Sequence, residues 1–167
     1  MSPAAQNRGY PWKYSLFIGM YYTVLAVFQS FVGNFYQDAR GIQGTELMWL
    51  LVALPAVSLV IQPLWGYAGD RMALRNTALY LMGAGTVLSI VLMGVSRSFF
   101  MLLLSTCLYA GFFTPIQPMG DSVILEDLGK WGMSFGPVRL TGSLSFALIS
   151  LLFGFVFEGR FHLVPWV

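Results

Sequence analysis

The chain has 167 residues, of which 57% are hydrophobic and only 10% are charged, and its formal net charge is +2. Soluble globular domains are about 45–50% apolar and about 25% charged, so these values, with a mean hydropathy of +0.70, exclude an ordinary soluble domain. The basic residues are scattered and form no run that could follow a phosphate backbone, which excludes a nucleic-acid-binding protein. We therefore expect the lipid bilayer as the surrounding medium of a multi-pass protein of the cell membrane.

Apolar segments of sufficient length recur along the whole chain, since a membrane-spanning helix needs about 20 predominantly apolar residues. The predicted spans cover residues 14–35, 47–65, 77–95, 99–122 and 136–157. A further apolar stretch, residues 161–167, has the pattern of the start of a sixth helix. The sequence therefore predicts an all-α, polytopic transmembrane helix bundle formed by residues 1–167, with the chain ending at the start of that sixth helix.

Prolines and positive charges refine this topology. Pro55 and Pro63 fall inside the second span, and Pro115 and Pro118 interrupt the fourth near its end. Proline is tolerated in membrane helices where other groups satisfy the freed backbone. With the N-terminus inside, more Lys and Arg residues lie on the inner side than on the outer, so the positive-inside rule predicts a cytoplasmic N-terminus.

Two charged residues lie on the helical side of the turn that joins the fourth and fifth spans. Asp121 and Arg139 sit where the apolar pattern has not yet ended or has already begun, whereas Glu126, Asp127 and Lys130 fit a short aqueous turn between them. An ionisable group at such a position is costly unless it is paired or faces water, so it marks a functional site. We expect Asp121 and Arg139 to contact each other at one polar cavity. Gln29 and Asn34, the amides of the first span, are further candidates for the same cavity.

The sequence has no metal-ligand cluster, nucleophile triad or phosphate-binding loop, so it predicts neither an enzyme nor a cofactor or metal site. Cys107 lies in an apolar run and is expected to be a buried, inert thiol. His162 stands alone in a predicted external loop.

Residues 66–76, GYAGDRMALRN, follow the second span. They resemble the signature G-x-x-x-D-[RK]-x-G-x-[RK] between helices two and three of the major facilitator superfamily. Gly66, Asp70, Arg71 and Arg75 match, and Ala73 replaces the usual glycine. The resemblance implies a conformational role for this motif. An ordinary hydrophilic loop is the alternative.

Residues 135–148, FGPVRLTGSLSFAL, resemble the start of helix five in the lactose permease and phenylpropionate permease-like branch of that superfamily. Gly136, Arg139 and Gly142 match the pattern F/Y-G-x-x-R-x-x-G, and Asp121 precedes Arg139 at the separation that these proteins keep. In lactose permease the corresponding acid, a glutamate, and arginine contact the sugar. The resemblance thus implies substrate contact by Asp121 and Arg139 and helix packing by the two glycines.

The resemblance also implies a secondary transporter, of which this chain holds the first five of twelve helices. Proton-coupled symport of a small organic solute would then require the second half of the transporter. An aromatic acid, a sugar and a nucleoside all remain open as the solute. The alternative is a non-transporting membrane fragment or scaffold in which Asp121 and Arg139 form only a structural latch between two helices.

Overall fold

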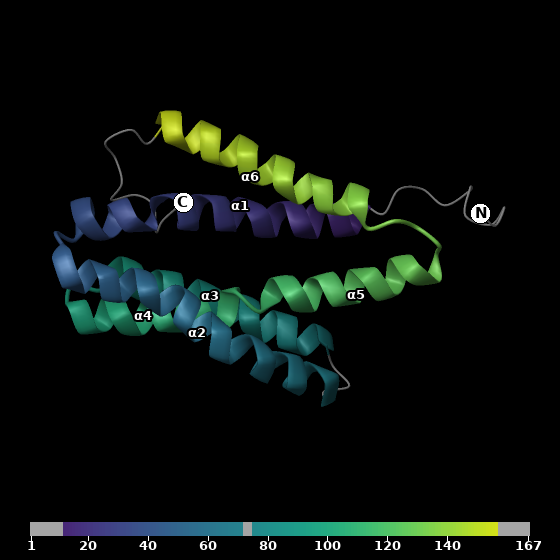
Figure 1. Ribbon diagram of the computed structural model, residues 1–167, viewed down its shortest axis with the longest axis horizontal. Helices are drawn as coiled ribbons and strands as arrows, with labels where there is room; N and C mark the ends of the chain where they lie inside the picture. The colour runs from purple at the N-terminus through teal and green to yellow at the C-terminus, as the bar shows by residue number, and fades with distance from the viewer. Residues whose placement is uncertain (1–11, 72–74, 157–167) are drawn as a thin grey trace. The chain divides into compact units, whose positions relative to one another are not determined.

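The computed structural model describes residues 12–71 and 75–156, and the described part is built from helices (Figure 1). In chain order these are α1 (Trp12–Asn34), the π-helix η2 (Phe35–Ala39), α2 (Gly44–Arg71), α3 (Arg75–Val95), α4 (Phe99–Phe113), α5 (Ile116–Lys130) and α6 (Gly136–Val156). Within the described residues, five stretches are long and apolar enough to cross a membrane: Trp12–Ala39, Gly44–Ala68, Thr77–Val95, Phe99–Lys130 and Gly136–Phe155. The predicted all-α fold with five membrane-spanning segments is therefore confirmed.

Two helices extend further than their apolar patterns predict. α2 continues to Arg71, so most of the expected loop that begins at Gly66 is helical. α5 continues to Lys130, so Glu126, Asp127 and Lys130 belong to a helix rather than to an aqueous turn. Lys130 Nζ lies 3.0 Å from Glu126 Oε1, an i,i+4 pair of the kind that supports a polar helix end. The expected start of a sixth span at residues 161–167, with His162, lies outside the described residues.

The chain divides into two compact units. Among the described residues, the first is formed by residues 12–30 and 120–156, and the second by residues 31–71 and 75–119. Each unit has its own packing among the described residues.

In the first unit, α6 lies alongside α1 (Figure 1). Thr141 Oγ1 donates to the Ser15 carbonyl at 3.3 Å, and the hydroxyls of Ser30 and Ser150 are 3.4 Å apart further along the same two helices. Contacts that advance together along both sequences mean that the two helices run parallel. A small apolar core joins α1, α5 and α6 and is formed by Tyr14, Ile18, Ile124, Leu128 and Val138.

In the second unit, α2 and α3 each pack against α4. The π-helix η2 and the residue that follows it, Arg40, form hydrogen bonds with α4 and α3. Tyr36 is fully buried, and its hydroxyl lies 2.6 Å from Thr106 Oγ1 of α4. Arg40 donates to the carbonyls of Met93 and Gly94 at the C-terminal end of α3, where helix carbonyls lack intrahelical partners. The polar segment after the first span is thus an ordered helix cap rather than a simple loop.

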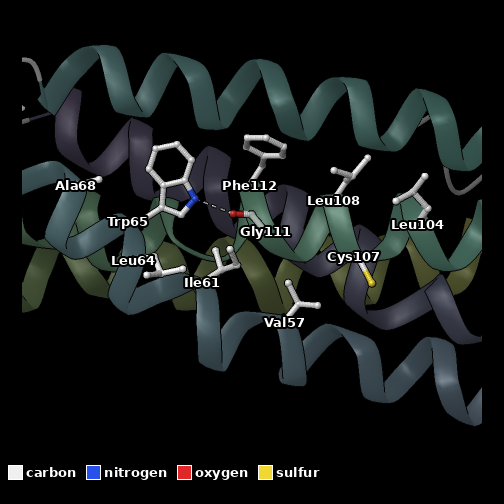
Figure 2. A pocket seen from close by; sticks show the side chains of 10 residues that line it. All are labelled: Val57, Ile61, Leu64, Trp65, Ala68, Leu104, Cys107, Leu108, Gly111 and Phe112. Atoms are coloured by element: carbon white, nitrogen blue, oxygen red, sulfur yellow. Dashed lines mark hydrogen bonds between the residues drawn. The ribbon is translucent and has the colours of Figure 1, made fainter.

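Pro115 separates α4 from α5 and has a specific structural consequence. Proline has no backbone N–H, so it cannot donate to the carbonyl four residues earlier, which belongs to Gly111. Trp65 of α2 donates its indole Nε1–H to that carbonyl at 3.0 Å (Figure 2). A side chain from a neighbouring helix therefore supplies the hydrogen bond that the proline removes, as a chain in lipid requires.

We predict that Trp65→Phe destabilises the protein, because it leaves the Gly111 carbonyl without this donor in apolar surroundings. An unsatisfied buried acceptor costs about 1–3 kcal/mol. Thermal unfolding in detergent measures the loss. The loss should shrink when Trp65→Phe is made together with Pro115→Ala, which restores a backbone donor. Equal losses with and without Pro115→Ala would show that the tryptophan acts through packing alone.

Candidate functional site

Asp121 and Arg139 form a direct ion pair in the first unit. Arg139 Nη1 donates to Asp121 Oδ2 at 2.9 Å. The side chains are 38% exposed for arginine and 23% exposed for aspartate, so the pair is only partly buried. The contact that the sequence predicts between these two residues is confirmed.

The position of Asp121 along its helix differs from the prediction. The apolar pattern places the end of the span next to Asp121, whereas α5 runs nine residues further, to Lys130. At about 1.5 Å of rise per residue, Asp121 lies about 13 Å from that helix end. Arg139 lies in the first turn of α6, which begins at Gly136. Asp121 therefore lies nine residues from the end of a candidate membrane-spanning stretch, Phe99–Lys130, and an unpaired carboxylate in such a stretch is costly.

An aromatic ring from α1 completes the surroundings of the arginine. The guanidinium carbon of Arg139 lies 5.2 Å from the ring centroid of Tyr22, within the range of a cation–π contact. Tyr21 meets the Tyr22 ring edge-on, with centroids 5.6 Å apart. No sequence motif marks Tyr22, because the first span contains many aromatic residues without one.

The two glycines of the α6 motif differ in role. A Cβ atom on Gly142 would lie 2.6 Å from Tyr22 Cδ2 and 2.7 Å from Ile18 Cγ2, so only glycine lets α6 approach α1 this closely. A Cβ on Gly136 would meet nothing within 4 Å among the described residues. The packing role expected of Gly142 therefore has a structural basis. The packing role of Gly136, an exposed residue at the start of the helix, stays a prediction.

The charges near the end of α5 form a second cluster. Tyr14 of α1 donates its hydroxyl to Asp127 Oδ2, and Lys130 Nζ lies 3.4 Å from Asp127 Oδ1. Lys13 lies over the ring of Tyr14 at 4.6 Å and near that of Trp131 at 5.5 Å. The hydrogen bond from Tyr14, whose side chain is buried, to Asp127 joins α1 to α5 at the polar end of the unit.

The amides proposed for the same cavity are less well supported. Gln29 and Asn34 are both exposed on α1. Gln29 belongs to the same unit as the ion pair, and the described part of the chain gives no hydrogen bond between it and either partner. Asn34 belongs to the second unit. A role for either amide in substrate binding stays a prediction.

The motif of residues 66–76, for which the resemblance implies a conformational role, lies at the junction of α2 and α3. Asp70 and Arg71 fall on the last turn of α2, and Arg75 opens α3, while the side chains of all three lie outside the part that the structure describes. A Cβ on Gly66 would meet nothing within 4 Å in the described residues. The role of this motif stays a prediction.

An apolar pocket of about 490 Å³ lies between α2 and α4 in the second unit (Figure 2). Its lining residues are Val57, Ile61, Leu64, Trp65, Ala68, Leu104, Cys107, Leu108, Gly111 and Phe112. Cys107 is only half-buried and forms part of this wall, which corrects the expectation of a buried thiol. The lining offers no charged group that could orient a polar solute. The charged pair, rather than this pocket, is therefore the candidate binding site for a polar molecule.

Comparisons with known proteins show which family and which proteins this chain resembles. Residues 11–167 match the model of the MFS_1 like family. A maltose permease of Geobacillus stearothermophilus is 28% identical over 155 residues, which cover 92% of this chain and 38% of that protein. The crystal structure of the nucleoside transporter NupG superposes with a TM-score of 0.83 at 10% identity, over 93% of this chain and 39% of that one.

The structural likeness to NupG establishes the fold, since the identity is too low to say more. The chain spans about two-fifths of the length of both proteins. The names of these two proteins, a permease and a transporter, describe proteins that carry solutes across membranes. Because the family model matches nearly the whole sequence, the chain belongs to the MFS_1 like family, a family of the major facilitator superfamily.

Proposed function

We propose that this chain forms helices of one half of a secondary transporter, and that Asp121 and Arg139 bind its solute. The supporting observation is the 2.9 Å ion pair inside a candidate membrane span, with both side chains still partly exposed. An ion pair is weak evidence for a stabilising latch, because the desolvation of both charges can exceed their Coulombic attraction. The partial exposure of both side chains leaves room for a solute to approach them.

The chemistry of the pair favours a polyhydroxylated solute. A carboxylate accepts hydrogen bonds and a guanidinium donates them, and these groups lie side by side here. A hydroxyl group can donate to Asp121 and accept from Arg139, whereas the carboxylate of an aromatic acid can only accept. The named relative, a maltose permease, carries a sugar in its name, and the branch to which the sequence motif is similar includes lactose permease. We therefore propose a sugar as the first solute to test, before a nucleoside or an aromatic acid.

We expect transport to require more helices than the described part of this chain forms. In transporters of this superfamily, the substrate site lies at the interface of two pseudo-symmetric halves. The chain spans about two-fifths of its relatives, so we propose that a second half completes the solute path. Uptake experiments should accordingly use the native gene product that contains this chain.

We predict that Arg139→Ala and Asp121→Ala lower the uptake of radiolabelled maltose by about tenfold or more, because each removes hydrogen bonds to a charged group. The assay compares maltose with uridine and phenylpropionate in cells with equal amounts of protein in the membrane. A protonophore added to the same assay should abolish accumulation if transport is coupled to protons, as the resemblance implies.

The matched control is Glu126→Gln, which removes an exposed charge from the same helix and should leave uptake unchanged. The exchange Asp121→Arg with Arg139→Asp separates the two interpretations of the pair. It should restore the amount of folded protein but not uptake. Full recovery of uptake by the exchange would mean that the pair is only a latch between α5 and α6 and does not bind the solute.

We also propose that the N-terminus is cytoplasmic, as the distribution of Lys and Arg predicts. Single cysteines at Gln43 and at Lys130, in a Cys107→Ser background, should then react with a membrane-impermeant thiol reagent from opposite sides. Gln43 should be labelled in intact cells and Lys130 only in opened membranes. The reverse pattern, or labelling of both in intact cells, would contradict this orientation.

A further inference from the structure

We propose that Tyr22 is a positioning residue that holds the guanidinium group of Arg139 against Asp121, and that Gly142 provides the space for its ring. The contact is a property of the first unit and can be measured without any solute. Its consequence for solute binding rests on the proposed function.

Arginine has a long and flexible side chain, so a single ion pair leaves it considerable freedom. Here the guanidinium is constrained from two directions. Asp121 accepts from Nη1 at 2.9 Å, and the ring of Tyr22 lies 5.2 Å from the guanidinium carbon. The carboxylate comes from α5 and the ring from α1, whereas the arginine itself belongs to α6. Three helices therefore fix one cation.

The ring of Tyr22 is in turn fixed by its neighbours. A Cβ on Gly142 would lie 2.6 Å from Tyr22 Cδ2 and 2.9 Å from Cε2, which no side chain could occupy without moving the ring. Tyr21 contacts the ring edge-on, with an interplanar angle of 79°. Because Gly142 lies one turn after Arg139 on α6, the helix that carries the cation also provides the slot for the ring that holds it.

The contact depends on the face of an aromatic ring rather than on the tyrosine hydroxyl. Tyr22→Phe keeps the face, and Tyr22→Leu removes it but keeps an apolar side chain for packing. If Tyr22 only fills space, the guanidinium of Arg139 should be equally reactive in the two variants. If Tyr22 positions the guanidinium, Arg139 should be more reactive in Tyr22→Leu than in Tyr22→Phe.

The first measurement is the rate at which phenylglyoxal modifies Arg139 in the purified native gene product, followed by mass spectrometry of the peptide. We expect the rate to rise about two- to fivefold in Tyr22→Leu, as the strength of a cation–π contact implies, and to stay unchanged in Tyr22→Phe. Arg40, which is fixed by Met93 and Gly94 in the other unit, is the internal reference. Equal rates in both Tyr22 variants would overturn the proposal.

The role of Gly142 is tested by Gly142→Ala beside Gly154→Ala. A Cβ on Gly154, on the same helix, would meet nothing within 4 Å in the described residues, so it controls for the change in helix propensity. Gly142→Ala should raise the Arg139 modification rate as Tyr22→Leu does, whereas Gly154→Ala should not. Indistinguishable rates in the two alanine variants would overturn the part of the proposal that concerns Gly142.

The second measurement is maltose uptake by the same variants. Tyr22→Leu should raise the half-saturating maltose concentration by about two- to fivefold at an unchanged amount of membrane protein, and Tyr22→Phe should not. A changed modification rate with no effect of Arg139→Ala on uptake would defeat the proposed function and leave the positioning contact supported. An unchanged modification rate would defeat the positioning contact, whatever the uptake shows.

Discussion

The absence of water inside a lipid bilayer is the constraint on which this structure depends. Every backbone group and every charge in the apolar region must find its partner within the protein. The helices satisfy most of this demand by themselves. Where Pro115 removes a donor, Trp65 supplies one to the Gly111 carbonyl, and where α3 ends, Arg40 donates to the last carbonyls. Trp65 and Arg40 therefore lie where the backbone requires a donor.

The pair of Asp121 and Arg139 follows from the same constraint but goes beyond it. Neither charge could remain alone inside a span, and each has the other at 2.9 Å. The neighbouring residues do not bury the pair completely, because 23% of the Asp121 side chain and 38% of the Arg139 side chain remain exposed. Close packing at Gly142 brings α6 to α1 and places the ring of Tyr22 at the guanidinium. A fixed but accessible donor and acceptor in a membrane is the arrangement that a binding site for a polar solute needs.

Much of this architecture could be predicted from hydropathy, because a membrane-spanning helix needs only length and apolar composition. The predicted contact of Asp121 with Arg139 followed from the cost of isolated charges. The helical end of α5 was missed, because Glu126, Asp127 and Lys130 look like a loop until the ion pair and the contact with Tyr14 are known. Tyr22 could not be predicted, because no local pattern tells which aromatic ring of a span faces a residue more than a hundred positions away. The hydrogen bond of Trp65 has no sequence pattern of its own. The sequence shows only that Pro115 leaves the Gly111 carbonyl without a backbone donor, not which side chain replaces it.

The most direct test of the central claim is a cross-link between positions 121 and 139. Asp121→Cys with Arg139→Cys, in a Cys107→Ser background, should react with a short bifunctional thiol reagent. A protease site inserted within residues 131–135 then separates α5 from α6 unless the link holds them together. We expect the two fragments to stay joined on a denaturing gel, and to separate when Glu126→Cys replaces Asp121→Cys. Separation of the fragments in the test pair, at full reagent labelling of both cysteines, would contradict the contact on which the proposed solute site depends.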